Sequence, residues 1–225
     1  MPQFETMRRH MVKGQILPEG VKNTAVLRAF QAIAREKFVP HSLARIAYMD
    51  AHFPLGRGRF LLRPATLARL LDACHFLPSH KILYVGCGSG YGPALLTHMG
   101  LSGVVLDCDD MFTQGTERLL KELNASSLRV VLGPLEEGWV PDAPYDRIFI
   151  EGSVDFLPEG LAIQLKEEGE LITLNRQGQA MKYVKKDRLY EIYLFEASGP
   201  HLPGFKNQGG FDFTGKETDF VYGKT

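Results

Sequence analysis

The sequence predicts an α/β fold, in which a mostly parallel sheet ends in an antiparallel hairpin and follows a helical extension. Three observations predict it. Apolar runs alternate with amphipathic helical segments from Lys81 onward. A glycine-rich turn directly follows the first apolar run. The first two runs are unbroken, as expected for strands with helices on both faces. We expect strands at 81–85, 104–107, 128–132, 147–151 and 170–175, and helices at 91–99, 111–123 and 158–166.

The N-terminal part predicts helices separated by a loop. Apolar residues share one face over 24–36, where Thr24 is a candidate N-cap. A second short helix is expected at 42–48. The segment 53–59 contains a proline and two glycines, which predict a linker without regular structure. Pro64 then begins the next helix at a favourable first position.

The C-terminal part predicts a hairpin and an irregular tail. Residues 180–186 and 189–197 flank a short turn, which indicates an antiparallel pair at the sheet edge. The tail is rich in glycine and phenylalanine. The expected organisation is a helical cap with an active-site loop over 1–75, a ligand-binding domain over 76–197 and a tail over 198–225.

The amino-acid composition makes several classes of function and partner unfavourable. With 26 basic and 26 acidic residues in 225, no overall positive field favours nucleic acid or a membrane surface. No apolar signal-peptide core opens the chain, and no apolar run is long enough to span a bilayer. Three scattered cysteines fit reduced thiols better than a disulfide framework or a zinc site. We therefore expect a cytoplasmic location, no metal, and neither nucleic acid nor membrane as partner.

The glycine turn is the main candidate site. It contains Gly86, Cys87, Gly88 and Gly90, and Asp107 ends the next predicted strand. Glycines let a ligand approach the backbone, and a carboxylate about 20 residues on can accept two ribose hydroxyls. This order of elements is typical of an adenosine site. Two alternatives are an ordinary βα turn and an N-cap role for Asp107.

The glycine spacing indicates whether the ligand carries phosphate groups. Dinucleotide sites read G-x-G-x-x-G and hold a pyrophosphate. Here the turn reads G-x-G-x-G, and Gly92 again follows at one-residue spacing. A ligand without phosphates fits better, which leaves an NAD-dependent oxidoreductase as a distant alternative. The turn resembles the first motif of S-adenosylmethionine-dependent methyltransferases.

The chain from about residue 7 to 197 resembles the protein-L-isoaspartate O-methyltransferase family. Its loop at 86–91 is similar to the family's G-T-G-S-G-Y, and its segment 54–58 is similar to P-I-G-x-G. Residues 144–148 resemble P-[FY]-D-R-I, and 164–171 resemble Q-L-K-x-G-G-R-L. The resemblance implies a seven-strand sheet, S-adenosylmethionine as cofactor, and methylation of a carboxylate in a protein or peptide with an anionic acceptor.

Several positions depart from the family pattern. The family's Q-T-I-S-Q-P segment is replaced, so that Arg59 stands for glutamine and Leu62 for the serine associated with catalysis. Tyr84 occupies the position of an acid before the glycines. Pro134 and Leu135 replace the acid and glycine of G-D-G, which the resemblance places beside the adenine.

Two further predictions come from charged residues. Guanidinium groups pair with carboxylates through two parallel hydrogen bonds, so Arg59 or Arg63 is expected to hold an anionic acceptor. The alternative is a set of salt bridges to neighbouring acids. Glu151 ends the fourth predicted strand, at the sheet edge where ligands bind, and could hold the donor's ammonium group. A surface glutamate is the alternative there.

The candidate site residues form two groups. The catalytic group is Arg59, Leu62 and Arg63. The cofactor-binding group is Gly86, Cys87, Gly88, Gly90, Asp107, Pro134, Leu135 and Glu151. Three readings remain open: a methyltransferase for isoaspartyl carboxylates, a divergent methyltransferase for another anion, and a silent donor-binding or interaction module.

Overall fold

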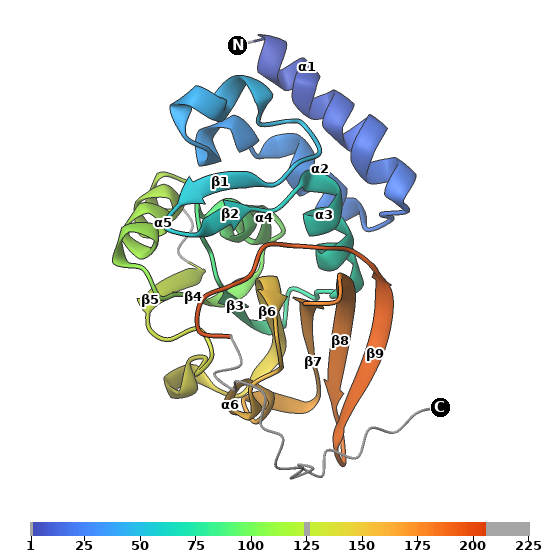
Figure 1. The fold of residues 1–225 in the computed structure, drawn as a ribbon, viewed down its shortest axis with the longest axis vertical. Helices are drawn as coiled ribbons and strands as arrows, with labels where there is room; N and C mark the ends of the chain where they lie inside the picture. Colours follow the sequence, from blue (N-terminus) through green and yellow to red (C-terminus); the bar gives the residue numbers. More distant parts are fainter. Residues whose placement is uncertain (1, 124–126, 206–225) are drawn as a thin grey trace, which may run out of the picture.

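A computed structural model describes residues 2–123 and 127–205. Its centre is a seven-stranded sheet in the order β5-β4-β3-β6-β7-β8-β9 (Figure 1). The first five strands in that order are parallel, and β8 and β9 are antiparallel additions. The predicted fold class is confirmed. The strands are β3 (Lys81–Val85), β4 (Ser102–Asp107), β5 (Leu128–Leu132), β6 (Tyr145–Val154), β7 (Leu165–Asn175), β8 (Gln179–Lys185) and β9 (Leu189–Glu196).

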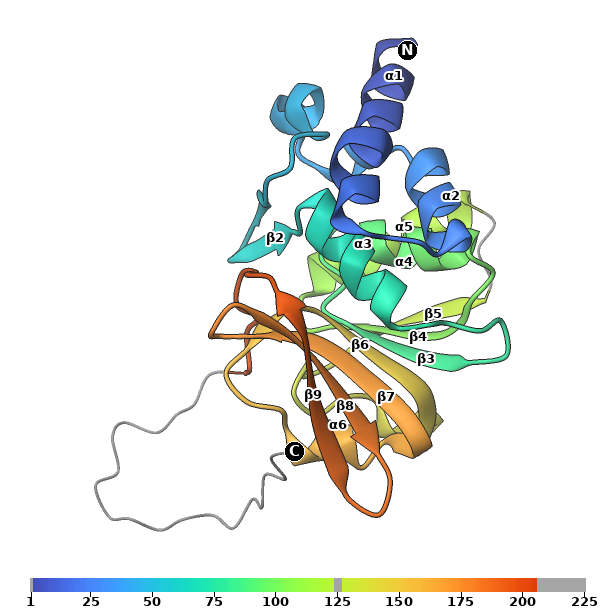
Figure 2. The same cartoon turned by 90° about the vertical axis from the view of Figure 1, so that its right-hand side faces the viewer.

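Helices lie on both faces of this sheet. Figure 2 shows α1 to α5 on one side and α6 on the other. Two apolar clusters correspond to these sides: alternate β3 residues Ile82 and Tyr84 face the first, and Leu83 and Val85 face the second. The period of two in a strand explains this division. The helices are α1 (Pro2–Met11), α2 (Thr24–Ala32), α3 (Pro64–Ala73), α4 (Tyr91–His98), α5 (Asp110–Glu122) and α6 (Glu159–Ala162).

The register of the sheet brings the carboxyl-terminal parts of three strands together, although β6 continues to Val154, past Glu151, where the sequence predicted its end. Val85, the last residue of β3, pairs with Leu106 on one side and Ile150 on the other. The residues that follow these positions are Gly86, Asp107 and Glu151. Because the three strands are parallel, the residues predicted to bind a ligand meet at the carboxyl end of the sheet.

Four secondary-structure elements differ from the predictions. The expected linker 53–59 is a two-stranded hairpin, β1 (Phe53–Gly56) and β2 (Arg59–Leu61). Its glycines do not interrupt a strand but form the turn, where Arg57 and Gly58 have φ of +51° and +72°. Positive φ at both central residues suits a two-residue hairpin turn.

The other three differences concern helices. The predicted helix 158–166 ends at Ala162, because Leu165 already pairs with Tyr145 as the start of β7. The predicted helix 24–36 ends at Ala32, and a 3₁₀ turn follows at Arg35–Phe38. A short 3₁₀ segment at His41–Ile46 takes the place of the helix expected at 42–48.

The C-terminal segment lies along the end of β6. The Ser153 N–H donates to the Pro200 carbonyl at 2.9 Å, and the Leu202 N–H donates to the Ser153 carbonyl at 3.0 Å. The described part of the predicted irregular tail, 198–205, therefore packs on the carboxyl-terminal end of β6. The remainder of that prediction, 206–225, lies outside the described residues. Within the described ranges no helix is long and apolar enough to cross a membrane.

Candidate functional site

The glycine turn between β3 and α4 has the backbone that only glycine adopts readily. Gly86, Gly88 and Gly90 have φ of +84°, +47° and +81°. Gly90 also packs closely on α5, since an added Cβ would lie 2.9 Å from the Thr116 hydroxyl oxygen. The turn is thus fixed by its sequence at the carboxyl end of β3.

Asp107 lies at the end of β4, fully buried, with its carboxylate directed toward the glycine turn. Its Oδ2 accepts the Gly88 N–H at 3.0 Å, and its Oδ1 accepts the Asp109 N–H at 3.2 Å. The N-cap of α5 is Asp109, whose side chain accepts the Met111 N–H. Asp107 is therefore free of a capping role and belongs to the turn.

Both oxygens of Asp107 also accept hydrogen bonds from Arg59 of β2. Arg59 Nη1 lies 2.7 Å from Oδ1, and Nη2 lies 3.0 Å from Oδ2. The arginine side chain is only 4% exposed, and its guanidinium carbon lies 5.6 Å from the centre of the Phe112 ring. Burial alone would lower the pKa of Arg59, but the neighbouring Asp107 carboxylate outweighs burial and raises it. The pair is charged, bidentate and shielded from water.

Apolar side chains cover the rest of the turn. An added Cβ at Gly86 would lie 3.1 Å from both Leu202 methyl carbons and 3.3 Å from Arg59 Nη2. One at Gly88 would lie 3.2 Å from a Leu55 methyl carbon. Both views place β2 and the C-terminal segment close together above this sheet edge (Figures 1 and 2). The hairpin and the C-terminal segment therefore close over the glycine turn.

Glu151 and Tyr84 form a second buried polar pair. The Tyr84 hydroxyl donates to Glu151 Oε2 at 2.6 Å, and both side chains are inaccessible or nearly so. Burial raises the pKa of Glu151 to about 8, against the opposing effects of Tyr84, Arg59 and Arg35. Glu151 Oε1 is buried and has no hydrogen-bond partner among the described residues. Glu151 is thus a buried carboxyl group with one unused acceptor oxygen.

The remaining predicted site residues lie at several places around the glycine turn. Cys87 is buried, and its sulfur lies 3.4 Å from the Thr116 hydroxyl. Leu135 is buried in the apolar cluster on the α6 side, whereas Pro134 is exposed. Leu62 is buried in the cluster on the helical side and offers no hydroxyl.

Arg63 is the only one of the two predicted acceptor-binding arginines that is accessible. Its side chain is 34% exposed, its Nε donates to the Thr66 hydroxyl at 2.7 Å, and its Nη1 lies 3.4 Å from Asp50. Arg63 and Arg59 therefore both have protein partners in this state, which is the alternative that the sequence left open.

Sequence reasoning missed Arg35. This arginine is fully buried, donates to the carbonyl oxygens of Ala47 and Leu62, and lies 5.0 Å from the centre of the Tyr91 ring. It joins the N-terminal segment to Leu62, two residues before α3, and its Nη1 has no partner among the described residues. Nothing in its position within an amphipathic segment distinguishes it from a surface arginine.

An adenosine-containing donor can be tested against this geometry. The left-handed glycines suit such a ligand, and the Glu151 Oε1 atom without a partner could accept a hydrogen bond from its ammonium group. The ribose carboxylate does not, because each oxygen of Asp107 already accepts from Arg59 and from one backbone N–H. In this structure the site does not fit the donor at Asp107. Withdrawal of Arg59 would release both carboxylate oxygens of Asp107.

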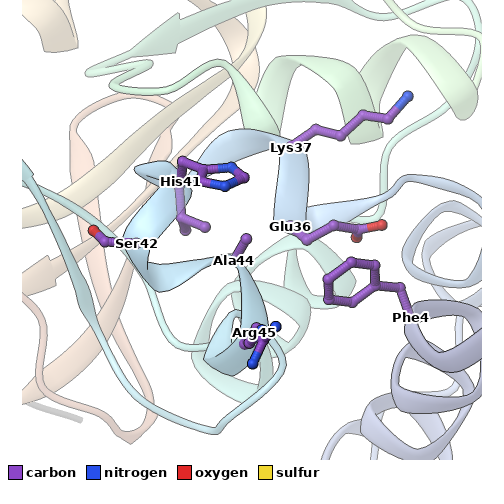
Figure 3. Close-up of a pocket in the computed structure, with 8 residues that line it drawn as sticks. Phe4, Glu36, Lys37, His41, Ser42, Ala44 and Arg45 are labelled. Carbon is purple, nitrogen blue, oxygen red and sulfur yellow. The ribbon is translucent and has the colours of Figure 1, made fainter. Parts of the chain in front are cut away.

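A hollow of about 790 Å³ lies elsewhere, among the N-terminal helices (Figure 3). None of the predicted site residues lines it. Phe4, Glu36 and Arg45 are among the side chains around it. Among the residues with described coordinates, no group of three or more histidine, cysteine or acidic side chains could hold a metal ion.

Comparisons with known proteins identify relatives along most of the chain. A family model described as protein-L-isoaspartate(D-aspartate) O-methyltransferase matches residues 7–196. A protein-L-isoaspartate O-methyltransferase of Picosynechococcus sp. is 33% identical over 181 residues, covering 80% of this chain and 82% of the relative. One from Gloeobacter violaceus is 35% identical over 162 residues, covering 72% and 79%.

Solved structures show the same fold at lower identity. A protein-L-isoaspartate O-methyltransferase has a TM-score of 0.74 and 23% identity, covering 88% of this chain and 67% of its own. A beta-aspartate methyltransferase of Plasmodium falciparum, solved in complex with S-adenosyl-L-homocysteine, has a TM-score of 0.71 and 18% identity, covering 89% and 98%.

Proposed function

Because the chain belongs to the protein-L-isoaspartate(D-aspartate) O-methyltransferase family, we propose that it methylates a carboxylate of a protein or peptide with S-adenosylmethionine as donor. An isoaspartyl carboxylate is the first candidate acceptor. The observation that carries the proposal is the position of Asp107, turned toward a left-handed glycine turn and bonded to the Gly88 N–H. Once Arg59 withdraws from its two oxygens, a carboxylate in this position can accept both ribose hydroxyls.

The reaction asks for positioning more than for proton transfer. A carboxylate acceptor has a pKa near 4 and is already ionised at neutral pH, so no general base is needed. The donor supplies an electrophilic methyl group on a sulfonium, and the acceptor oxygen takes that methyl as the carbon–sulfur bond breaks. Alignment within a site closed to water can contribute roughly 7–11 kcal/mol to lowering the barrier.

Each predicted residue has a proposed part in that positioning. Asp107 binds the ribose and Glu151 the donor's ammonium group, while the turn at 86–90 approaches the donor through its backbone. Arg59 and Arg63 hold the anionic acceptor. The serine hydroxyl expected from the family pattern is absent at Leu62, and an orienting hydrogen bond of that kind is worth about 1 kcal/mol. Its loss slows methyl transfer without abolishing it. Pro134 and Leu135 flank the adenine without an acid to hold its amino group.

A methylation assay tests the proposed function. Labelled S-adenosylmethionine is incubated with the full chain and an isoaspartyl peptide, and in parallel with the same peptide containing an ordinary aspartyl residue. We expect label in the isoaspartyl peptide, and a loss of at least 10-fold in Asp107→Asn. Equal absence of label from both peptides would reject isoaspartyl methylation and leave another anionic acceptor.

A second candidate is a donor-binding or interaction module without methyl transfer. The bidentate Arg59–Asp107 pair favours an interaction module that binds no donor, because this pair occupies the carboxylate that a donor requires. Calorimetry with S-adenosylhomocysteine separates the candidates. Binding with no methyl transfer to any carboxylate peptide supports a donor-binding module, and the absence of any heat supports an interaction module that binds no nucleoside.

A proposal about the compartment is supported by the cysteines of the chain rather than by the site. We propose that the chain works in the cytoplasm on protein or peptide substrates. Its cysteines Cys74, Cys87 and Cys108 are all free, the first two buried and the third exposed. Free thiols are typical of a reducing compartment.

A further inference from the structure

We propose that Arg59 is a latch that couples recognition of the anionic acceptor to opening of the donor site. This inference rests on the proposed function. In the state seen here the guanidinium binds Asp107; when an acceptor carboxylate binds the guanidinium instead, both oxygens of Asp107 become available to a ribose. Arg59 is in this account a positioning residue for the donor and a binding residue for the acceptor.

The geometry makes the two roles of Arg59 mutually exclusive. The face of a guanidinium formed by its two terminal nitrogens holds one carboxylate at a time, and on Arg59 this face is used on Asp107. Asp107 in turn has a backbone N–H on each oxygen, from Gly88 and Asp109. Those two hydrogen bonds remain when Arg59 leaves, so the carboxylate stays in place at the glycine turn. Release of Arg59 therefore exposes a ready ribose site.

The element that carries Arg59 is able to move as a unit. Strand β2 has three residues and pairs only with β1, in a two-stranded sheet separate from the main one. An isolated two-stranded hairpin is marginally stable by itself. Gly56, Arg57 and Gly58 at its tip are exposed, and Arg57 is 63% exposed. The hairpin is held by the Arg59–Asp107 pair, by the Leu55 contact with the glycine turn, by the exposed Arg57–Asp109 ion pair and by the buried side chains of Phe53 and Leu61.

The neighbouring Arg63 favours binding of an acceptor anion close to Arg59. Arg59 and Arg63 flank the same short segment, and Arg63 is the accessible member of the two. An acceptor carboxylate approaching Arg63 supplies the negative charge that Arg59 needs on leaving Asp107. Coupling between two ligands is reciprocal, so an acceptor that opens the donor site must itself bind more tightly when the donor analogue is present.

Calorimetry with S-adenosylhomocysteine tests the latch without any methyl transfer. The titration is made with the wild type, Arg59→Gln and Arg59→Lys, and each is repeated with a saturating isoaspartyl peptide and with its methyl-esterified form. Arg57→Gln is the matched control, because it removes a positive charge from the same hairpin and leaves the Arg59–Asp107 pair intact. Circular dichroism melts confirm that each variant is folded.

The latch predicts a distinct pattern of dissociation constants. The free carboxylate peptide tightens S-adenosylhomocysteine binding to the wild type and to Arg57→Gln at least 5-fold, whereas the esterified peptide does not. Arg59→Gln binds at least 10-fold more tightly than the wild type without peptide, and the peptide adds nothing. Arg59→Lys, which keeps the charge but loses the fork, lies between them and serves as the test if Arg59→Gln does not fold.

Other results separate the latch from the proposed function. Equal affinity of wild type and Arg59 variants, with or without peptide, overturns the latch and leaves the methyltransferase proposal standing. Tight binding to Arg59→Gln together with no methylation of any peptide upholds the latch and rejects the enzymatic function. Absence of binding to every variant overturns both.

Discussion

At the scale of single residues, the site depends on a contact that no sequence pattern contains. The sequence indicates Asp107 as a ribose ligand and Arg59 as an acceptor ligand, 48 positions apart. The structure brings these two side chains into one buried ion pair. Removing one partner of such a pair strongly lowers the stability of the folded protein, because the other charge is left buried. The residue types were predictable from the sequence, and their pairing was not.

Glu151 gives a prediction about pH. Its folded pKa of about 8 lies above the unfolded value of 4.5, so the native state retains a proton that the unfolded state loses. The stabilisation is complete below pH 4.5 and is lost as pH rises through 8, with a slope of up to about 1.4 kcal/mol per pH unit. Tyr84, Arg59, Arg35 and Asp107 are the charged or titratable groups that act on it.

Urea unfolding of the wild type and Glu151→Gln between pH 5 and 9 measures this effect. Glutamine keeps the shape and does not titrate. We expect the wild type to lose stability relative to the variant from pH 5 to 8, and the difference to level off above pH 8. A constant difference over the whole range would contradict a buried, protonated Glu151.

Leu62 gives a second prediction at this scale. It is buried, so Leu62→Ser should lower the free energy of unfolding by about 2–5 kcal/mol, as should the control Leu62→Ala. Only the serine variant restores the hydroxyl of the family pattern. We expect methyl transfer by Leu62→Ser to exceed that of Leu62→Ala about 5-fold, from a hydrogen bond of about 1 kcal/mol. Equal rates in the methylation assay would show that a hydroxyl here does not orient the acceptor.

At the scale of elements, the β1–β2 hairpin was the largest error of prediction. Glycine and proline were interpreted as signs of an irregular linker, whereas positive φ at Arg57 and Gly58 makes the turn of a hairpin. The sequence shows Arg-Gly where Asn-Gly is the usual signal, so the turn was easily missed. The parallel strands were predictable because long apolar runs and their order leave few alternatives. The early end of α6 depends on a strand pairing between distant residues.

The turn itself can be strengthened. An L-residue other than asparagine or aspartate is disfavoured at positive φ by roughly 1 kcal/mol or more, and asparagine tolerates it. Arg57→Asn should therefore be more stable than Arg57→Ala by about 1 kcal/mol. Both variants lose the exposed ion pair with Asp109, which cancels in the comparison. Chemical denaturation checks the difference, and identical midpoints would show that the turn is not as described.

At the scale of the whole molecule, the sheet confirms the predicted fold class and places the strand ends as the site requires. The C-terminal segment was predicted only as irregular. In the structure its Leu202 and Phe205 are buried in the cluster on the α6 side, and Leu202 lies against Gly86 and Gly152. No local periodicity encodes this packing, since the segment is extended and its partners come from β3 and β6. It closes over the glycine turn beside the hairpin, since a Cβ added at Gly86 would lie close to both Leu202 and Arg59.

Leu202→Ala tests this closure. We expect a loss of about 2–5 kcal/mol in the free energy of unfolding, as for other buried leucines. Val140→Ala is a suitable control, because Val140 is 65% exposed and its truncation should change stability by less than about 0.5 kcal/mol. Urea denaturation of both variants measures the two values. Similar small losses for both would mean that the C-terminal segment does not pack on the glycine turn.

The claim on which this account depends is that Asp107 exchanges Arg59 for the sugar of a donor. A crystal structure of the full chain with S-adenosylhomocysteine and an isoaspartyl peptide measures it directly. The account predicts both ribose hydroxyls within hydrogen-bond distance of Asp107 and the Arg59 guanidinium on the peptide carboxylate. A structure in which Arg59 still binds Asp107, with no nucleoside at the glycine turn, would contradict it.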